Sequence, residues 1–95
     1  MYAVATRWQM DPAKRAQQDE GLPMIVAGVR NSPGFVSGYW SRGVEDPALS
    51  LGYIVFGTKD EASAFEANVR GNRENQAQAG IELLELLVLE VGANA

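Results

Sequence analysis

The sequence contains no cysteine and no histidine among its 95 residues. The missing cysteine excludes disulfides and thiolate metal sites. The missing histidine removes the usual imidazole ligand for zinc, iron or haem, and with it the commonest general base near neutral pH. We therefore expect no metal site and no cofactor. A chain this short buries a small share of its surface, so association with another chain is the remaining route to additional burial.

Basic stretches and long apolar runs are also missing. Eight lysines and arginines stand against twelve acidic residues, which gives a net charge of −4. Because no basic stripe is present to neutralise phosphates, nucleic acid is not an expected partner. The apolar runs are too short to cross a bilayer, and the first residues lack the pattern of a signal peptide. We expect a cytoplasmic protein without membrane contact, folded as a single domain over residues 1–95.

Four segments alternate between two unlike faces, as β-strands do. They are residues 2–9, Phe35–Arg42, Leu49–Gly57 and Ile81–Val91. A short polar loop joins the second and third segments, so they form an antiparallel hairpin. Strict alternation in the last segment predicts Ile81, Leu83, Leu87 and Leu89 on one face and Leu84, Leu86 and Val88 on the other. Both faces of this strand therefore require cover.

Two helices are expected between the strands. Asp11-Pro12 supplies an N-cap carboxylate and a proline at the first helical position, which predicts a helix over residues 13–30. We expect it to be interrupted at Gly21-Leu22-Pro23, where proline removes a backbone hydrogen bond and kinks or splits the helix. Thr58-Lys59-Asp60-Glu61 matches a capping box and begins a second helical segment, which Gly80 closes.

The resulting order, β-α-β-β-α-β, predicts an α+β fold of the ferredoxin-like kind, a four-stranded antiparallel sheet with both helices on one face. The other sheet face is apolar and has a geometric area of roughly 500 Å². A second copy would cover it through an interface approaching ~800 Å² of accessible area per partner. We therefore expect a homodimer that pairs as a dimeric α/β barrel.

Several local features follow one another in the order seen in a known superfamily. They are Pro23 within the first helix, Pro33-Gly34-Phe35, the following Val36-Ser37-Gly38-Tyr39-Trp40, and Phe56 at the end of the third strand. In these features the chain resembles the dimeric α/β-barrel superfamily, specifically antibiotic-biosynthesis-monooxygenase-like small proteins. The resemblance implies cofactor-free oxygenation of an electron-rich substrate in an aromatic-lined pocket between sheet and helices. Haem-degrading members carry an axial histidine, which this sequence lacks.

The candidate substrate-binding residues are Trp8, Asn31, Tyr39, Trp40, Tyr53 and Phe65. The five aromatic side chains could line a pocket, but aromatic residues also dominate cores and interfaces. Asn31 could orient a substrate oxygen, although it also suits the turn that ends a helix. Tyr39 and Trp40 are adjacent in a strand and face opposite ways, so one pocket cannot contain both.

Two functions remain open from the sequence. The first is a cofactor-independent monooxygenase-like protein that acts on a small aromatic molecule, a phenol or a quinol, with no catalytic residue assigned. The second is a non-catalytic dimeric module that binds a small ligand or a protein partner, which the missing histidine and cysteine favour. An open aromatic pocket favours an enzyme or a ligand binder over a purely structural module.

Overall fold

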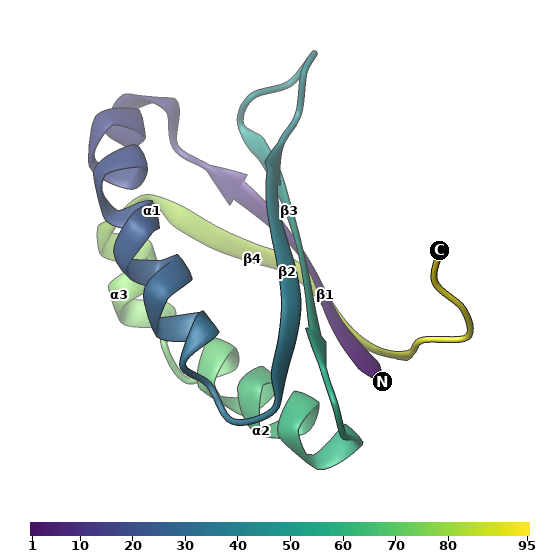
Figure 1. Cartoon of the computed structure of the whole chain (residues 1–95). Helices are drawn as coiled ribbons and strands as arrows, with labels where there is room; N and C mark the ends of the chain where they lie inside the picture. Colours follow the sequence, from purple (N-terminus) through teal and green to yellow (C-terminus); the bar gives the residue numbers. More distant parts are fainter.

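The structure is a computed structural model that describes all residues, 1–95. Its elements are β1 (Tyr2–Met10), the 3-10 turn η1 (Pro12–Lys14), α1 (Arg15–Arg30), β2 (Phe35–Arg42), β3 (Leu49–Phe56), α2 (Lys59–Arg70), α3 (Arg73–Gln78) and β4 (Ile81–Glu90). The four strands form one antiparallel sheet in the order β2-β3-β1-β4. All three helices cover the same face, and the other face is open (Figure 1). The predicted ferredoxin-like fold is confirmed.

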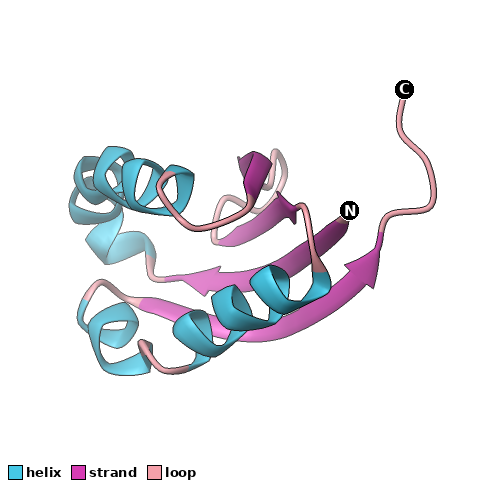
Figure 2. Cartoon of the chain, turned by 60° about the horizontal axis from the view of Figure 1, so that its bottom comes forward, coloured by secondary structure: helices cyan, strands magenta, loops and turns pink.

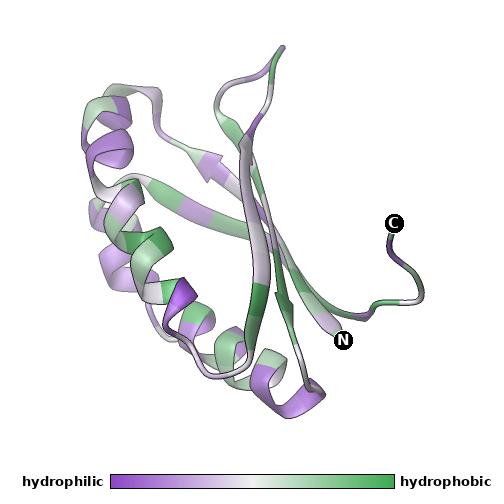
Figure 3. Cartoon of the chain, in the orientation of Figure 1, coloured by the Kyte–Doolittle hydropathy of each residue, from purple (hydrophilic) through white to green (hydrophobic).

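The core lies between the helix layer and the sheet, as the view in Figure 2 shows from another side. Its fully enclosed members are Val4, Ile54, Phe56, Ala62 and Leu86. Phe56 is the largest of them and meets the ring of Phe65 from α2 at a centroid distance of 5.0 Å. Figure 3 shows hydrophobic segments along β3 and, between hydrophilic ones, along β4. Apolar residues are not confined to the covered side, because Tyr53 and Leu87 lie in one row with Ala5 on the other face and remain exposed.

Helix α1 is continuous from Arg15 to Arg30 and contains Pro23, so a split of the helix at Gly21-Leu22-Pro23 is wrong. Proline removes a single N–H from the helical ladder, and the other bonds of the helix persist around it. The predicted N-cap is confirmed, because the Asp11 carboxylate accepts a hydrogen bond from the Ala13 N–H at 3.0 Å. The residues directly after the cap form the 3-10 turn, and the α-helix itself begins two residues later than expected.

The second helical segment is divided into α2 and α3 by Gly71 and Asn72. Its predicted start is confirmed, since the Thr58 hydroxyl accepts from the Glu61 N–H at 3.2 Å. The break was not expected from the sequence. Gly71 is the C-cap residue of α2 and its N–H bonds back to the Ala67 carbonyl, which completes the last turn. None of the helices has the length and apolar character needed to span a bilayer.

Strand β4 carries a bulge that the sequence did not predict. Trp8 pairs with Leu83 while the neighbouring Arg7 pairs with Glu85, so Leu84 has no partner on β1. One extra residue reverses the inward and outward alternation beyond it. The two predicted faces of this strand are therefore wrong. Ile81, Leu83, Leu86 and Val88 lie on the helix-covered face, whereas Leu87 and Leu89 lie on the open face.

Candidate functional site

A cavity of about 650 Å³ lies between the sheet and the helices, and we call it the aromatic cavity. The sheet contributes Thr6, Trp8, Trp40, Arg42, Ser50 and Gly52. The helices contribute chiefly Gln18, Asp19, Leu22, Ile25, Phe65 and Asn68. Its volume falls within the roughly 300–1,000 Å³ that is usual for small-molecule sites. Half of the 20 lining residues are hydrophobic, as such sites require for burying an organic ligand.

The strand register determines the floor of this cavity. Trp40, Gly52 and Thr6 stand side by side on β2, β3 and β1. In the next row of the same face, Ser50 lies between Arg42 and Trp8. In these two rows, β3 thus presents only Gly52 and Ser50, which are smaller than their neighbours on β1 and β2. Strands β1 and β2, which flank β3, are two strand spacings apart, roughly 10 Å. This separation leaves room for a small fused ring system to lie across β3.

Gly52 is required by the close approach of a neighbouring side chain. A Cβ atom at this position would lie 2.6 Å from the hydroxyl oxygen of Thr6. That hydroxyl accepts a hydrogen bond from the Trp8 indole N–H at 2.8 Å. A buried indole needs such an acceptor, and the bond fixes the orientation of the ring. Gly52, Thr6 and Trp8 therefore act together to shape the floor.

A second glycine positions the other tryptophan. A Cβ atom at Gly38 would lie 3.1 Å from the outer ring atoms of Trp40 and 3.0 Å from Ile54. The indole of Trp40 therefore rests over the bare backbone of Gly38, two residues earlier on the same face of β2. Trp8 and Trp40, the two tryptophans of the chain, both line the aromatic cavity.

The structure places the predicted site residues in three locations. Trp8, Trp40 and Phe65 line the aromatic cavity. Tyr39 and Tyr53 are cross-strand partners on the open face, and Tyr39 is 73% exposed. Asn31 is the C-cap of α1 and lies outside the cavity lining. The question left by the sequence is thus answered, because Trp40 and not Tyr39 faces the helices.

Sequence reasoning did not select Thr6, Gln18, Arg42, Ser50 or Gly52 as site residues. Thr6 could have been found, because it shares the strand phase of Trp8. Gly52 and Arg42 depend on which strands are neighbours and in what register, which a single sequence does not reveal. Gln18 gave no local signal at all.

Neutral polar groups supply hydrogen-bonding capacity around the apolar lining. The amide of Gln18 is 7% exposed and its nitrogen donates to the carbonyls of Asp11 and Ala79, which ties α1 to the start of β4. The Thr6 hydroxyl already accepts from Trp8, so its own hydrogen is available to donate toward a ligand. Asn68 lines the cavity from α2 with an unengaged amide. The Thr6 hydroxyl and the Asn68 amide suit the oxygen atoms of a phenol or a carbonyl.

Only Asp19 and Arg42 are charged among the lining residues, and they pair with each other. The hydrogen bond from the Arg42 guanidinium, aided by the charge of Arg15, holds the pKa of the Asp19 carboxyl below its ordinary value. Asp19 therefore remains ionised and is a poor proton acceptor.

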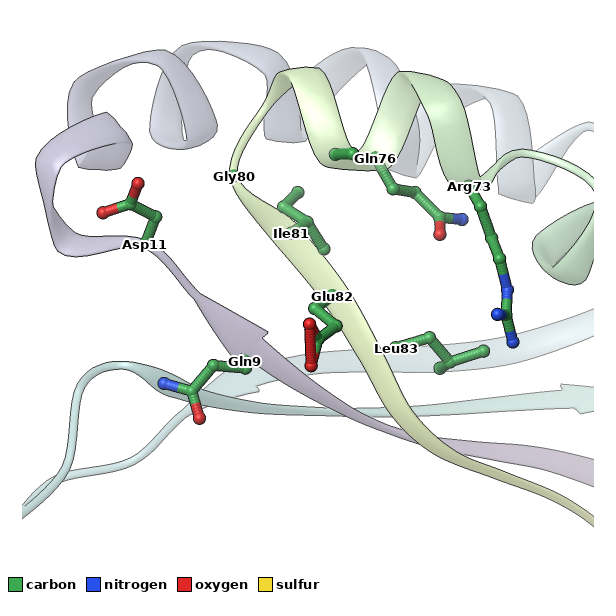
Figure 4. A pocket seen from close by; sticks show the side chains of 9 residues that line it. Gln9, Asp11, Arg73, Gln76, Gly80, Ile81, Glu82 and Leu83 are labelled. Carbon is green, nitrogen blue, oxygen red and sulfur yellow. The ribbon is translucent and has the colours of Figure 1, made fainter.

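A smaller hollow of about 440 Å³ lies on the other side of Gln76 and Ile81, which line both spaces. Figure 4 shows Arg73 and Gln76 reaching from α3 toward β4, with Glu82 and Gln9 near the strands. Only three of its nine lining residues are hydrophobic. The aromatic cavity is the better candidate site, because it is larger and encloses more apolar surface.

The comparisons with known proteins give a fold and no sequence relative. No protein-family model matches the chain, and no curated protein sequence matches it. A protein from Deinococcus radiodurans, whose name marks it as a candidate antibiotic biosynthesis monooxygenase, superposes with a TM-score of 0.82 at 14% identity, covering 100% of this chain and 96% of that one. The chain has the fold of the antibiotic-biosynthesis-monooxygenase-like proteins.

Two further structures with the antibiotic-biosynthesis-monooxygenase-like fold are informative. SnoaB from Streptomyces nogalater, a cofactor-independent oxygenase solved as a point mutant, has a TM-score of 0.75 at 16% identity over 98% of this chain and 94% of its own. The monooxygenase from the gene ActVA-Orf6 of Streptomyces coelicolor, in complex with nanaomycin D, has a TM-score of 0.65 at 18% identity over 99% of this chain and 90% of its own. At these identities the likeness establishes the fold alone.

The family resemblance includes haem-degrading proteins. The residues of this chain do not fit a haem whose iron is bound by a histidine or cysteine side chain. The chain has no histidine or cysteine to coordinate the iron. The residues described also contain no group of three or more side chains suited to hold a metal ion.

Proposed function

We propose that the protein is a cofactor-independent monooxygenase-like enzyme that acts on a small aromatic molecule, a phenol or a quinol. The observation that carries the proposal is the slot over β3, where Trp40 lies beside Gly52, Trp8 lies diagonally opposite beside Ser50, and the Thr6 hydroxyl lies at the floor. A planar ring bound there would contact apolar and aromatic surface on several sides. The fold shared with SnoaB, a cofactor-independent oxygenase, supports the same conclusion.

The proposed chemistry requires little of the protein beyond binding and orientation. An electron-rich substrate such as an anthrone loses a proton and transfers electrons to dioxygen. Its CH₂ group becomes a carbonyl, and the second oxygen atom leaves as water. The Thr6 hydroxyl would donate to the developing oxyanion, which is the kind of preorganised contact that lowers a barrier. The apolar lining would keep the reactive anion away from bulk water.

Oxygen uptake tests this proposal directly. The purified protein is incubated in air with anthrones, quinols and flavonoid-like phenols, and uptake is compared with a boiled sample. We expect uptake with one compound class, and a reduction of about tenfold or more in Trp40→Ala, because the substrate loses one wall of the slot. Tyr39→Phe, an aromatic change on the open face, is the matched control and should retain full activity. No uptake above the boiled sample with any compound contradicts the proposal.

The alternative is a non-catalytic ligand-binding module, and one observation favours it. Asp19 is the carboxylate that lines the cavity, and its pKa is lowered by the hydrogen bond from Arg42, which makes it a poor general base. Quenching of tryptophan fluorescence by an aromatic compound, without oxygen uptake, would identify a binder. Uptake together with quenching would identify the enzyme.

We also propose that two copies pair through their open sheet faces, as expected from the sequence. Tyr39, Tyr53 and Leu87 form one row across this face with Ala5 between the last two, and all three large side chains are at least 41% exposed. Leu89 extends the apolar surface along one neighbouring row, and Leu51 lies in the other beside Arg7. Large apolar side chains gathered into one exposed patch indicate an interaction surface, whereas single exposed apolar residues do not. In a two-fold dimer, a second copy presents the same patch and would bury it.

A further inference from the structure

The charges at the mouth of the aromatic cavity are unbalanced. Asp19 pairs with Arg42 and also lies 3.6 Å from the Nε atom of Arg15. Two cations and one anion leave one positive charge, although the whole chain carries −4. The side chains of Arg42 and Asp19 are 38% and 50% exposed, which places them where solvent meets the cavity. A local positive charge at the entrance of an acidic protein favours anionic ligands.

Arg42 also has donors that are not engaged within the protein. One Nη2 contact engages Asp19, and no other hydrogen bond from the guanidinium is made within the protein. A guanidinium has five N–H groups in a planar fork that matches a carboxylate. Ser50, the neighbour of Arg42 on the floor, donates its hydroxyl to the Ser41 carbonyl at 2.8 Å and cannot serve an anion with it. Arg42 is therefore the one charged donor of the lining.

The position of Arg42 relative to the aromatic floor decides the shape of the ligand. Arg42, Ser50 and Trp8 form one row, so the backbone of Arg42 lies about two strand spacings, roughly 10 Å, from the strand that carries Trp8. Trp40 precedes Arg42 by two residues on the same face. A ring system over β3 would thus direct a substituent at its outer end toward the guanidinium.

We propose that the ligand of the aromatic cavity is an aromatic acid, whose planar ring lies between Trp8 and Trp40 and whose carboxylate binds Arg42 at the mouth. The inference rests on the proposed function and specifies its substrate class. The phenol or quinol end of the molecule lies inward near Thr6, and the carboxylate stays at the solvent edge. Asp19 competes with that carboxylate for Arg42, so ligand binding exchanges one anionic partner for another.

Fluorescence titration tests the proposal, because the two tryptophans of the chain both line the cavity. The probes are anthraquinone-2-carboxylate and its neutral counterpart, anthraquinone-2-carboxamide. We expect the acid to bind about tenfold more tightly than the amide at low salt, since the guanidinium is partly exposed and screened. Added sodium chloride should weaken binding of the acid and leave the amide unchanged.

Two variants separate recognition from structure. Arg42→Gln should lower the affinity for the acid to that for the amide, and Asp19→Asn should raise the affinity for the acid about two- to fivefold by freeing the guanidinium. Arg73→Gln, in the smaller hollow, is the matched control and should change neither affinity. If Arg42→Gln does not fold, the proposal is still tested by the ratio of the affinities for acid and amide, by the salt dependence of that ratio, and by the effect of Asp19→Asn.

The outcomes distinguish this inference from the function on which it rests. Equal binding of acid and amide to the wild-type protein, or an equal loss of both in Arg42→Gln, overturns the aromatic-acid proposal and leaves the aromatic cavity as a ligand site. Failure of both probes to quench the tryptophans contradicts an aromatic ligand altogether, and the acid proposal with it. Preference for the acid that disappears in Arg42→Gln supports it.

Discussion

The two faces of the sheet carry aromatic residues of similar size in different settings. On the helix-covered face, Trp40 stands over Gly38, and the Trp8 indole is hydrogen-bonded to Thr6. On the open face, Tyr39 and Tyr53 lie opposite each other, and nothing in the chain covers them. Adjacent residues of β2 are thus divided between a concave site and a flat surface.

The difference shows that composition alone does not identify a binding site. Both faces contain aromatic and aliphatic side chains, but only the helix-covered face also has small residues that leave space between them. The open face presents large apolar side chains without a hollow between them, with Arg7 and Glu85 beside Leu51, and such a surface suits a second flat surface. The covered face is hollow, which suits a small planar molecule.

Leu86→Arg is the change with the largest expected effect on this comparison. Leu86 is 7% exposed and belongs to the enclosed core, so the substitution buries an unpaired cation. We expect a loss of about 4 kcal/mol or more in the free energy of unfolding, or failure to fold. Urea denaturation followed by circular dichroism measures it. A variant as stable as the wild type would mean that the helix layer does not seal this face.

Leu87→Arg changes the next residue of β4, whose side chain lies on the opposite face of the sheet. Its side chain is 48% exposed in the single chain, so the cation remains in water and the protomer should fold. We expect a homodimer to dissociate, because the charge would meet an apolar partner surface. Sedimentation velocity at micromolar concentration gives the result. A wild-type protein that is already monomeric would refute the dimer, and a variant that stays dimeric would place the interface elsewhere.

Thr6→Val tests the hydrogen bond that orients the cavity floor. The change keeps the side-chain shape and leaves the Trp8 N–H without its acceptor. We expect a loss of about 1–2 kcal/mol in unfolding free energy, together with a shift in tryptophan emission. Thr6→Ser keeps the hydroxyl and serves as the control. Identical emission and stability in all three proteins would show that Trp8 does not depend on this contact.

Asp19→Asn has the smallest expected effect on stability. The pKa of Asp19 is lowered from its ordinary value of 3.8, chiefly by the hydrogen bond from Arg42. A lowered pKa in the folded state stabilises the protein above the unfolded value, and the contribution is lost as the pH falls through the folded value. The wild type should thus exceed the variant slightly at neutral pH, and the two should converge in acid. In an Arg42→Gln background the difference should shrink. A gap that widens in acid would contradict the sign.

Much of the fold could be predicted from local patterns. The strand segments, the Asp11 and Thr58 caps and the hairpin follow from alternation, turn residues and capping chemistry. The continuity of α1 through Pro23 and the break between α2 and α3 at Gly71 could not be predicted from local patterns. For a proline inside a helix, the surrounding packing decides whether the lost hydrogen bond is tolerated. The bulge at Leu84 was also hidden, and it reversed the predicted faces of β4.

The candidate site was predicted only in part. Trp8, Trp40 and Phe65 were selected for their chemistry and line the aromatic cavity, whereas Tyr39, Tyr53 and Asn31 lie elsewhere. An aromatic residue has the same intrinsic character on either face. Which face it occupies relative to the helices depends on the whole sheet.

The sequence by itself determined the order of the elements, the absence of imidazole and thiol chemistry, and the alternation that separates Tyr39 from Trp40. These properties follow from residue identity and from spacing along the chain. Only the tertiary structure decided that Trp40, Gly52 and Thr6 form one row under the helices and that Arg42 lies at its mouth. Register and layer are set by long-range pairing, so residues far apart in the chain become neighbours in ways that local patterns do not encode.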